Sequence, residues 1–213
     1  MDMRFVRFLG KLLISVGCGV LMFVAWTLWG TGLYTSQQQD QLQDSWAKEP
    51  PIVLEDSPDV QVPESFQPPS GHQAFKMRIP KIGFDQIVVE GVGTEALHKG
   101  VGHYPSCREG FEPPLCTDFE EMWPGENGRV IVSGHRTTYG APFYDLDKLQ
   151  PGDEVITETR WGEFTYEVTR SEIVRPDSLA IAIQSDVAEI VLTTCNPRFS
   201  AAQRLIVYAR LVT

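Results

Sequence analysis

Three polar residues stand where apolar, strand-like runs of this chain end, and their types could together activate a thiol. Cys195 ends one run, Arg204 opens the next, and His135 ends a third run 60 residues upstream of the cysteine. In β proteins, functional side chains commonly lie where strands give way to loops. A thiol is a strong nucleophile only as the thiolate, which a nearby imidazolium or guanidinium stabilises.

Cys195 and Arg204 are expected to face each other across a hairpin, because the eight residues 196–203 connect their two runs. Opposed residues of an antiparallel pair have Cα atoms about 4.5–5.5 Å apart. No local rule places His135 beside them, so only the fold can complete the site. The alternative is that Cys195 is a buried small apolar residue and Arg204 lies on a solvated strand end.

The N-terminus predicts a membrane anchor. Residues 12–34 carry no charge, and the basic residues Arg4, Arg7 and Lys11 lie in the tail 1–11 that precedes them. A helix of that length spans about 34 Å, enough for a hydrocarbon core of about 30 Å. The basic flank predicts a cytoplasmic N-terminus and an extracellular remainder. A cleaved signal peptide is the alternative, but its apolar region is typically only about 7–15 residues.

Residues 35–73 are expected to form a disordered extracellular linker. The segment is rich in proline and polar residues, with Pro50-Pro51 and Pro68-Pro69 near its middle and end, and it lacks apolar periodicity. Such a composition buries too little apolar surface to order the chain. A short helix over 37–46 is an alternative that would leave the role of the segment unchanged.

Residues 74–213 are expected to form one domain, which is mostly β. Strand-like runs lie at 75–80, 86–90, 130–135, 153–159 and 164–174, ahead of the two C-terminal runs. Short helical segments are expected at 94–99 and 143–149. Many short strands separated by turn residues predict a barrel or a sandwich.

The chain is acidic, with a formal net charge of −10. Proteins that bind nucleic acid present basic surfaces, so the balance argues against a nucleic-acid partner.

Cys107 and Cys116 lie nine residues apart in one loop and could close a short disulfide. An extracellular setting is oxidising, and Cys195 would then be the odd thiol and a candidate reactive group. Two free loop thiols or a metal site are the alternatives. A metal site is poorly supported, because His98 and His103 match no usual zinc spacing.

Five blocks of sequence, in this order, resemble the sortase family and most closely its class E group. The blocks are Gly100–Pro105, Pro124–Gly128, Ser133–Phe143, Leu192–Pro197 and Arg204–Val207. The resemblance covers essentially residues 75–213, and an anchor followed by a linker also fits.

The resemblance implies an all-β, eight-stranded barrel with one or two short helices, on the outer face of a Gram-positive cell membrane. Such a transpeptidase cuts a secreted protein between Thr and Gly of a C-terminal sorting motif, of the Leu-Ala-X-Thr-Gly or Leu-Pro-X-Thr-Gly type. It then joins the new carboxyl end to an amine of a cell-wall precursor, and it needs no cofactor and no metal.

The resemblance also implies roles for particular residues. Cys195 matches the nucleophile, His135 the general acid/base, and Arg204 the group that holds the substrate and its oxyanion. Tyr104 and Thr194 are expected to line the substrate groove. Arg136 and Arg198 are rival cations, and we prefer Arg204.

One stretch departs from the family pattern. Residues 106–123 are longer than expected and hold both Cys107 and Cys116. We hypothesise a disulfide-pinned lid or side wall that tunes substrate choice, with a solvated surface insertion as the alternative. The acidic run 118–121 could bind a cation, but it does not match a Ca²⁺ loop.

Three other functions compete with the cell-wall transpeptidase. A pilin-polymerising sortase would use a lysine side chain as acceptor, and residues 44–46 offer a lid-like Asp-Ser-Trp sequence. A non-catalytic, membrane-anchored binding module would carry an unreactive Cys195. In a plain cysteine protease, water would replace the acceptor amine.

Overall fold

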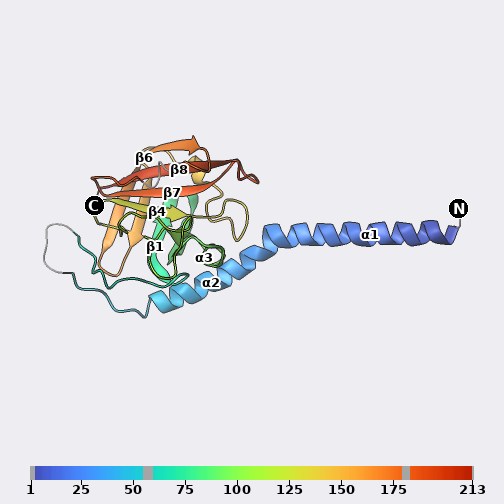
Figure 1. Ribbon diagram of the computed structural model, residues 1–213, viewed down its shortest axis with the longest axis horizontal. Helices are drawn as coiled ribbons and strands as arrows, with labels where there is room; N and C mark the ends of the chain where they lie inside the picture. The colour runs from blue at the N-terminus through green and yellow to red at the C-terminus, as the bar shows by residue number, and fades with distance from the viewer. Residues whose placement is uncertain (1–2, 55–59, 179–182, 213) are drawn as a thin grey trace.

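Eight strands between residues 73 and 211 close into a barrel, as the family resemblance implies (Figure 1). The structure, a computed structural model, describes residues 3–54, 60–178 and 183–212. Around the barrel the strands follow the order β1-β2-β3-β4-β7-β8-β6-β5. They comprise β1 (Gln73–Ile79), β2 (Phe84–Glu90), β3 (Gly102–His103), β4 (Arg129–Ser133), β5 (Glu154–Glu158), β6 (Glu163–Val174), β7 (Glu189–Asn196) and β8 (Gln203–Leu211). Seven of them match the predicted strand-like runs, and β3 was not predicted.

Strand β7 is apolar on both faces because both faces are covered. Ile190 and Leu192 belong to the core cluster inside the barrel. Val191 lies in a second cluster with Ile206 and Tyr208 of β8. A strand buried on both sides has a continuous apolar sequence rather than an alternating one, which explains the unbroken run before Cys195.

The pairing of β4, β7 and β8 positions the candidate catalytic residues. Strands β4 and β7 are parallel, with Ser133 opposite Thr193, so their C-terminal ends meet at one edge of the barrel. Strands β7 and β8 form an antiparallel hairpin in which Cys195 is paired with Arg204. The expectation that these two residues face each other is confirmed.

The helices inside the barrel domain are short. They are η2 (Pro80–Ile82), α3 (Thr94–Leu97) and η3 (Leu146–Lys148). The helix expected over 143–149 contracts to the single 3-10 turn η3. Phe143 is drawn into the core, and its backbone N–H donates to the carbonyl of His135 at 3.1 Å rather than to a helical neighbour.

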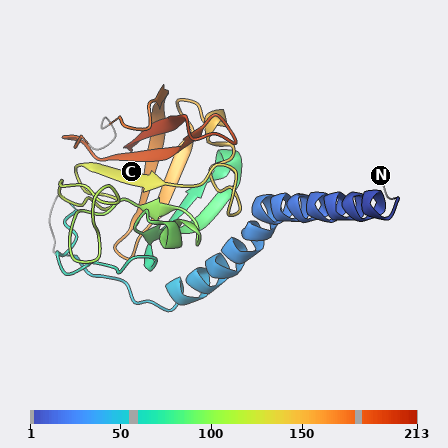
Figure 2. The same ribbon diagram turned by 45° about the vertical axis from the view of Figure 1, so that its right-hand side comes forward.

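The N-terminal helices form an arm that leaves the barrel (Figures 1 and 2). They are α1 (Met3–Ala25), a π-helical turn η1 (Trp26–Gly30) and α2 (Thr31–Trp46). Within the described residues, Met3–Trp46 is the one helix long and apolar enough to cross a membrane. The arm bends near η1 in both views, and π-turns are a common cause of helix kinks.

The disordered linker expected over 35–73 differs from the structure at its start, because α2 docks on the barrel. Leu42 packs with Ile87 and Val89 of β2, and Trp46 joins them. The buried Gln39 donates its side-chain amide to the carbonyls of Ile87, at 3.0 Å, and Lys99, at 2.8 Å. It also accepts the N–H of Ile87 at 2.8 Å. Because Gln39 docks the helix through hydrogen bonds to the backbone, this contact produces no apolar periodicity from which the docking could be predicted.

The proline-rich segment after α2 also lies on the barrel. Val62 and Phe66 pack against the core, and the Phe66 ring meets Trp123 edge-on at 4.8 Å between centroids. The backbone N–H of Val62 donates to Glu126 at 2.7 Å. The part of the expected linker that falls at 55–59 lies outside the described residues.

Replacing Gln39 with alanine should loosen α2. The change leaves an N–H and two carbonyls without partners, which costs about 1–3 kcal/mol for each buried group. We expect a lower midpoint in thermal unfolding of the full chain in detergent. Gln37→Ala is the matched control, because Gln37 is exposed on the same helix. Equal midpoints for the two variants would contradict the docking.

Candidate active site

A cleft of about 400 Å³ lies at the barrel edge where β4 and β7 end. It is lined by all five residues that the sequence singled out for the site: Tyr104, His135, Thr194, Cys195 and Arg204. The cleft wall is mixed, with apolar side chains beside these polar ones. Cys195 is partly exposed and is the unpaired cysteine of the barrel.

Two hydrogen bonds clamp the backbone before His135 to the strand that carries Cys195. The N–H of Gly134 donates to the carbonyl of Thr193 at 3.1 Å, and the hydroxyl of Thr194 donates to the carbonyl of Gly134 at 2.7 Å. Any side chain on Gly134 would meet Phe143 and Val101 at 2.8 Å. A glycine is therefore needed where the two strand ends meet, and Thr194 ties the two candidate catalytic segments together.

The His135 imidazole sits in a ring stack at the mouth of the cleft. Its ring centroid lies 5.1 Å from that of Tyr139 and 6.5 Å from that of His98. Among the described residues, none hydrogen-bonds to its buried Nε2. Burial, with His98 as a smaller cause, lowers the pKa of His135. The imidazole is thus held toward its neutral form, which can accept a proton.

Of the three candidate cations, Arg204 is the one that lines the cleft. Its Nη1 donates to the carbonyls of Ala201 and Gln203, both at 3.1 Å, within the hairpin loop. Arg198 instead pairs with Asp145 and Asp147, outside the cleft lining.

Arg136 supports the site from beneath. It is only 4% exposed, and its Nη1 donates to the carbonyl of Cys195 at 3.3 Å and to Asn196 Oδ1 at 2.7 Å. Its Nη2 pairs with Asp147 at 3.1 Å. Arg136 therefore fixes the end of β7 and does not line the cleft.

Arg175, which the sequence did not single out, is a further cation in the cleft lining. It follows the end of β6 and its guanidinium pairs with Asp177 at 3.4 Å. Nothing in the local pattern signals it, because only the closure of the barrel brings the end of β6 to this edge.

Comparison with known proteins decides the family. Residues 77–212 match the sortase domain family. The chain is 36% identical to sortase D of Bacillus subtilis over 154 residues, which cover 70% of this chain and 69% of that protein. The chain belongs to the sortase family.

Relatives named sortase E are also similar. Sortase SrtE1 of Streptomyces coelicolor is 30% identical over 221 residues, which cover 97% of this chain and 57% of that longer protein. The solved structure of S. coelicolor sortase E1 with a tripeptide in its active site has a TM-score of 0.56 at 28% identity, covering 69% of this chain and 92% of that one. The predicted resemblance is confirmed, and the chain is a cysteine transpeptidase of the sortase family with relatives in the D and E groups.

The fold is shared more widely. A Clostridium perfringens sortase D5 has a TM-score of 0.61 at 24% identity, covering 84% of this chain and 99% of that one. The likeness extends to the whole barrel.

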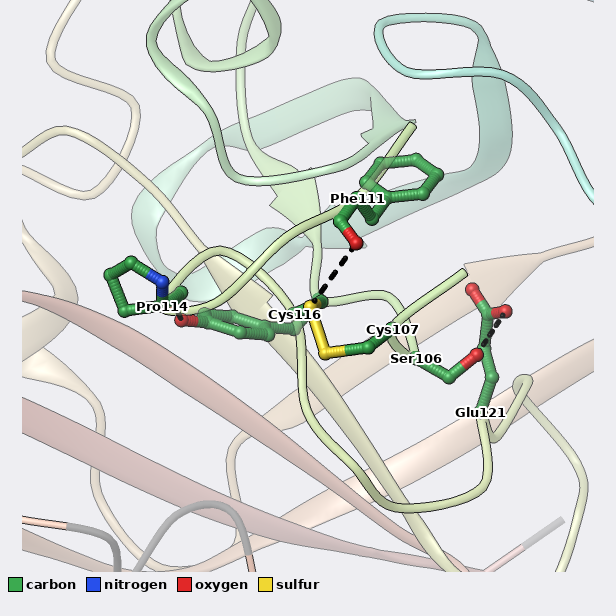
Figure 3. Close-up of a disulfide and its surroundings, with 7 residues drawn as sticks. Ser106, Cys107, Phe111, Pro114, Cys116 and Glu121 are labelled. Carbon is green, nitrogen blue, oxygen red and sulfur yellow. Dashed lines mark hydrogen bonds between the residues drawn. A yellow bond between two sulfur atoms is a disulfide. The ribbon is translucent and has the colours of Figure 1, made fainter. Parts of the chain in front are cut away.

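In this sortase, the loop 106–123 reaches the cleft. Cys107 and Cys116 are joined in a disulfide, and the Cys116 sulfur lies 3.5 Å from the carbonyl of Phe111 (Figure 3). Beyond it, Pro114 and Leu115 line the cleft, and the Tyr104 hydroxyl donates to the carbonyl of Pro114. Burial raises the pKa of Tyr104, so the phenol stays a hydrogen-bond donor.

A buried charged cluster fastens this loop to the barrel. His103 Nδ1 lies 2.9 Å from Glu90 Oε2, and its Nε2 lies 3.1 Å from the carbonyl of Met122. From the loop, Arg108 pairs with Glu90 at 3.1 Å and also with Glu121. Glu90, His103 and Glu121 have the composition of a metal site, with ligand atoms within 4.8 Å of one another. Here Arg108 and the ring protons of His103 balance the two carboxylates, so the protein itself accounts for the arrangement.

The cluster shifts the pKa of each of its titratable members. Burial would lower the pKa of His103, but the carboxylates of Glu90 and Glu121 outweigh it and raise that pKa. Burial would raise the pKa of Glu90, but His103 and Arg108 hold it below its usual range. For Glu121 burial dominates, helped by Glu90, and raises the pKa to about 7.

The stability of the loop should therefore fall as the pH rises. Glu121 and His103 both have raised pKa values in the folded protein, so their contribution is fully present below the unfolded values and is lost as the pH rises through the folded ones. The pKa of Glu90 is lowered in the folded protein, so Glu90 acts in the opposite sense. Its contribution to stability is present above its unfolded pKa and is lost as the pH falls below that value.

We expect the unfolding midpoint to drop between about pH 4.5, the unfolded value for Glu121, and about pH 7, its folded value. Glu121→Gln, which mimics the protonated form, should flatten the slope in that window, whereas the exposed neighbour Glu120→Gln should not. Unfolding followed by circular dichroism across the pH series measures both. Parallel slopes for wild type and Glu121→Gln would show that Glu121 does not titrate there.

Proposed function

We propose that this sortase cleaves a sorting motif of the Leu-Ala-X-Thr-Gly or Leu-Pro-X-Thr-Gly type between Thr and Gly, and transfers the secreted protein to an amine of a cell-wall precursor. The observation that carries the proposal is the convergence of Cys195, His135 and Arg204 on one cleft, with Cys195 paired to Arg204 across the hairpin. The apolar N-terminal helix supports a single-pass anchor. Its basic flank favours a cytoplasmic N-terminus and an extracellular barrel.

The proposed reaction has two steps. The Cys195 sulfur attacks the Thr carbonyl carbon, the bond to the Gly nitrogen breaks, and His135 gives that leaving amine a proton. The acceptor amine then attacks the thioester and loses its proton to His135. The carbon–sulfur bond breaks, and the leaving sulfur takes that proton from His135, which restores the Cys195 thiol and the neutral imidazole. Arg204 meets the oxyanion that forms in each step.

The neutral imidazole fits this cycle. Since burial lowers the pKa of His135, the resting residue can take the thiol proton as the attack begins. The proton it acquires is the one that the Gly amine needs. A single partly buried imidazole therefore serves as base and acid in turn.

A peptide assay on the full chain in detergent tests the proposal. Leu-Ala-X-Thr-Gly and Leu-Pro-X-Thr-Gly peptides are supplied with an amine, and the products are identified by mass. We expect an amide product, which Cys195→Ala abolishes. An acid product alone would indicate a protease, product only with a lysine side-chain acceptor would indicate a pilin polymerase, and no thioester from either peptide would indicate a binding module.

Replacing Arg204 with alanine should lower kcat by about 10²–10³, the usual effect of removing an oxyanion donor. Arg210→Ala is the matched control, because Arg210 is exposed on the same strand and away from the cleft. Initial rates at saturating peptide measure the effect. Near-full activity of Arg204→Ala would remove Arg204 from the mechanism.

We also propose that the loop 106–123 is a side wall of the substrate groove, which favours the hypothesis of a specificity wall over that of a solvated insertion. Pro114 and Leu115 contribute to the cleft, whereas Phe119 of the same loop does not. The lid-like sequence at 44–46 is not part of the cleft lining, and Trp46 packs on the barrel core. The pilin-polymerising alternative thus loses the feature that favoured it.

Leu115→Ala and the double variant Cys107→Ser/Cys116→Ser should change the ratio of kcat/KM between the two peptides. Losing one apolar contact shifts such a ratio by about tenfold. Phe119→Ala should leave the ratio unchanged, since its side chain is similarly exposed but lies outside the cleft. An unaltered ratio of kcat/KM in all three variants would support the alternative hypothesis that the loop 106–123 is a solvated surface insertion.

A further inference from the structure

The ring stack on His135 connects the candidate catalytic centre to the N-terminal helix. Tyr139 stacks on His98, with centroids 3.9 Å apart and planes at 14°, and its ring also faces His135. The rings of His98 and His135 therefore both contact the Tyr139 ring. Displacing Tyr139 or His98 would alter the surroundings of the His135 imidazole.

Helix α2 holds the outer side of this stack. The Thr31 hydroxyl oxygen accepts the backbone N–H of Tyr139 at 3.1 Å, and the Thr35 hydroxyl donates to the carbonyl of His98 at 2.8 Å. A methyl group on Gly32 would lie 3.4 Å from the Cα of Gly140, so the helix and loop backbones are in direct contact. Each ring neighbour of His135 is thus bonded through its backbone to α2.

The loop that carries Tyr139 has a strained backbone. Tyr139 has φ 51° and Ala141 has φ 47°, values in the left-handed region that side chains other than glycine rarely adopt. Such conformations cost on the order of 1–3 kcal/mol each and persist only where surrounding contacts impose them. The contacts from α2 are of this kind, because they meet the loop at Tyr139 and Gly140.

We propose that the docked helix α2 positions His135, acting through Tyr139 and His98, so that the anchor helix sets the catalytic competence of the barrel. The inference rests on the proposed role of His135 as general acid/base. Tyr139 and His98 are positioning residues here, and neither is required to touch the substrate. Attachment to the membrane and organisation of the active site are then one structural unit.

The consequence concerns kcat more than substrate binding. With α2 displaced, the loop can relax, the imidazole gains water, and its pKa rises toward the ordinary value because burial is the main cause of its depression. The ionisable groups that stack near His135 are His98 and Tyr139, and those that share its cleft are Tyr104, Arg175, Cys195 and Arg204, the last two on β7 and β8. Those strands and the loop 106–123 do not depend on α2, so the groove for the peptide persists.

Gly32→Leu tests the inference by forcing α2 away from Gly140 while leaving every barrel residue intact. Gly19→Leu is the matched control, because a side chain at Gly19 meets nothing within 4 Å. Thr35→Val is a second variant, which removes the bond to His98 without adding bulk. Hydrogen exchange along α2 reports the docking, and circular dichroism reports the fold of the barrel.

Two measurements decide the outcome for the full chain in detergent. NMR of labelled histidine, assigned with single His→Gln variants, gives the titration midpoint of His135. Peptide kinetics give kcat and KM. In Gly32→Leu and Thr35→Val we expect the midpoint to rise and kcat to fall about tenfold or more, since small misplacements of catalytic groups have large effects. We expect KM to change less than kcat, and Gly19→Leu to match wild type in every measurement.

Substitutions of Tyr139 complete the test. Tyr139→Ala should reproduce the raised His135 midpoint and the lowered kcat. Tyr139→Phe should keep both at their wild-type values, because it retains the stacking ring. Increased exchange in α2 with an unchanged His135 midpoint would overturn the inference. The titration is measured without substrate, so a wild-type chain that lacks transpeptidase activity would refute the proposed function and still leave the positioning of His135 to be judged by its midpoint.

Discussion

The parallel pairing of β4 with β7 is the constraint on which the active site depends. Neighbouring parallel strands end at the same edge, so His135 and Cys195 meet there although 60 residues separate them. The bonds from Gly134 and Thr194 lock the two ends together. Because both strands are buried in the barrel core, neither can shift its register without exposing apolar residues. The packing of the core therefore also fixes the relative positions of His135 and Cys195.

The two residues His135 and Arg136, which follow β4, point to different places: one lines the cleft and the other bonds the end of β7. His135 borders the cleft, where burial keeps it near neutrality. The next residue, Arg136, is buried beneath and bonds the backbone at Cys195 and the side chain of Asn196. A buried guanidinium needs acceptors on several sides, and here Asp147 supplies the charge that balances it. Arg136 therefore stabilises the end of β7, whereas Arg204 lines the cleft.

Two segments outside the barrel complete the site. The loop 106–123 brings Pro114 and Leu115 to the cleft and is fixed by a disulfide and by ion pairs to Glu90. Helix α2 reaches the rings around His135 through backbone bonds. Both attachments include polar contacts to the barrel, whose preferred distances and angles fix position. The barrel supplies the reacting groups, and these segments shape their surroundings.

The sequence alone determined most of the strands, the long apolar N-terminal helix and the pairing of Cys195 with Arg204, because these follow from local periodicity, composition and hairpin length. Its resemblance to the sortases selected the barrel over the sandwich. The tertiary structure decided the rest. The order of the apolar runs does not reveal that β4 lies beside β7, that Arg175 reaches the cleft, or that Arg136 turns inward. The docking of α2 was hidden as well, since Gln39 and Thr35 bind backbone groups of distant residues and leave no apolar pattern in their own segment.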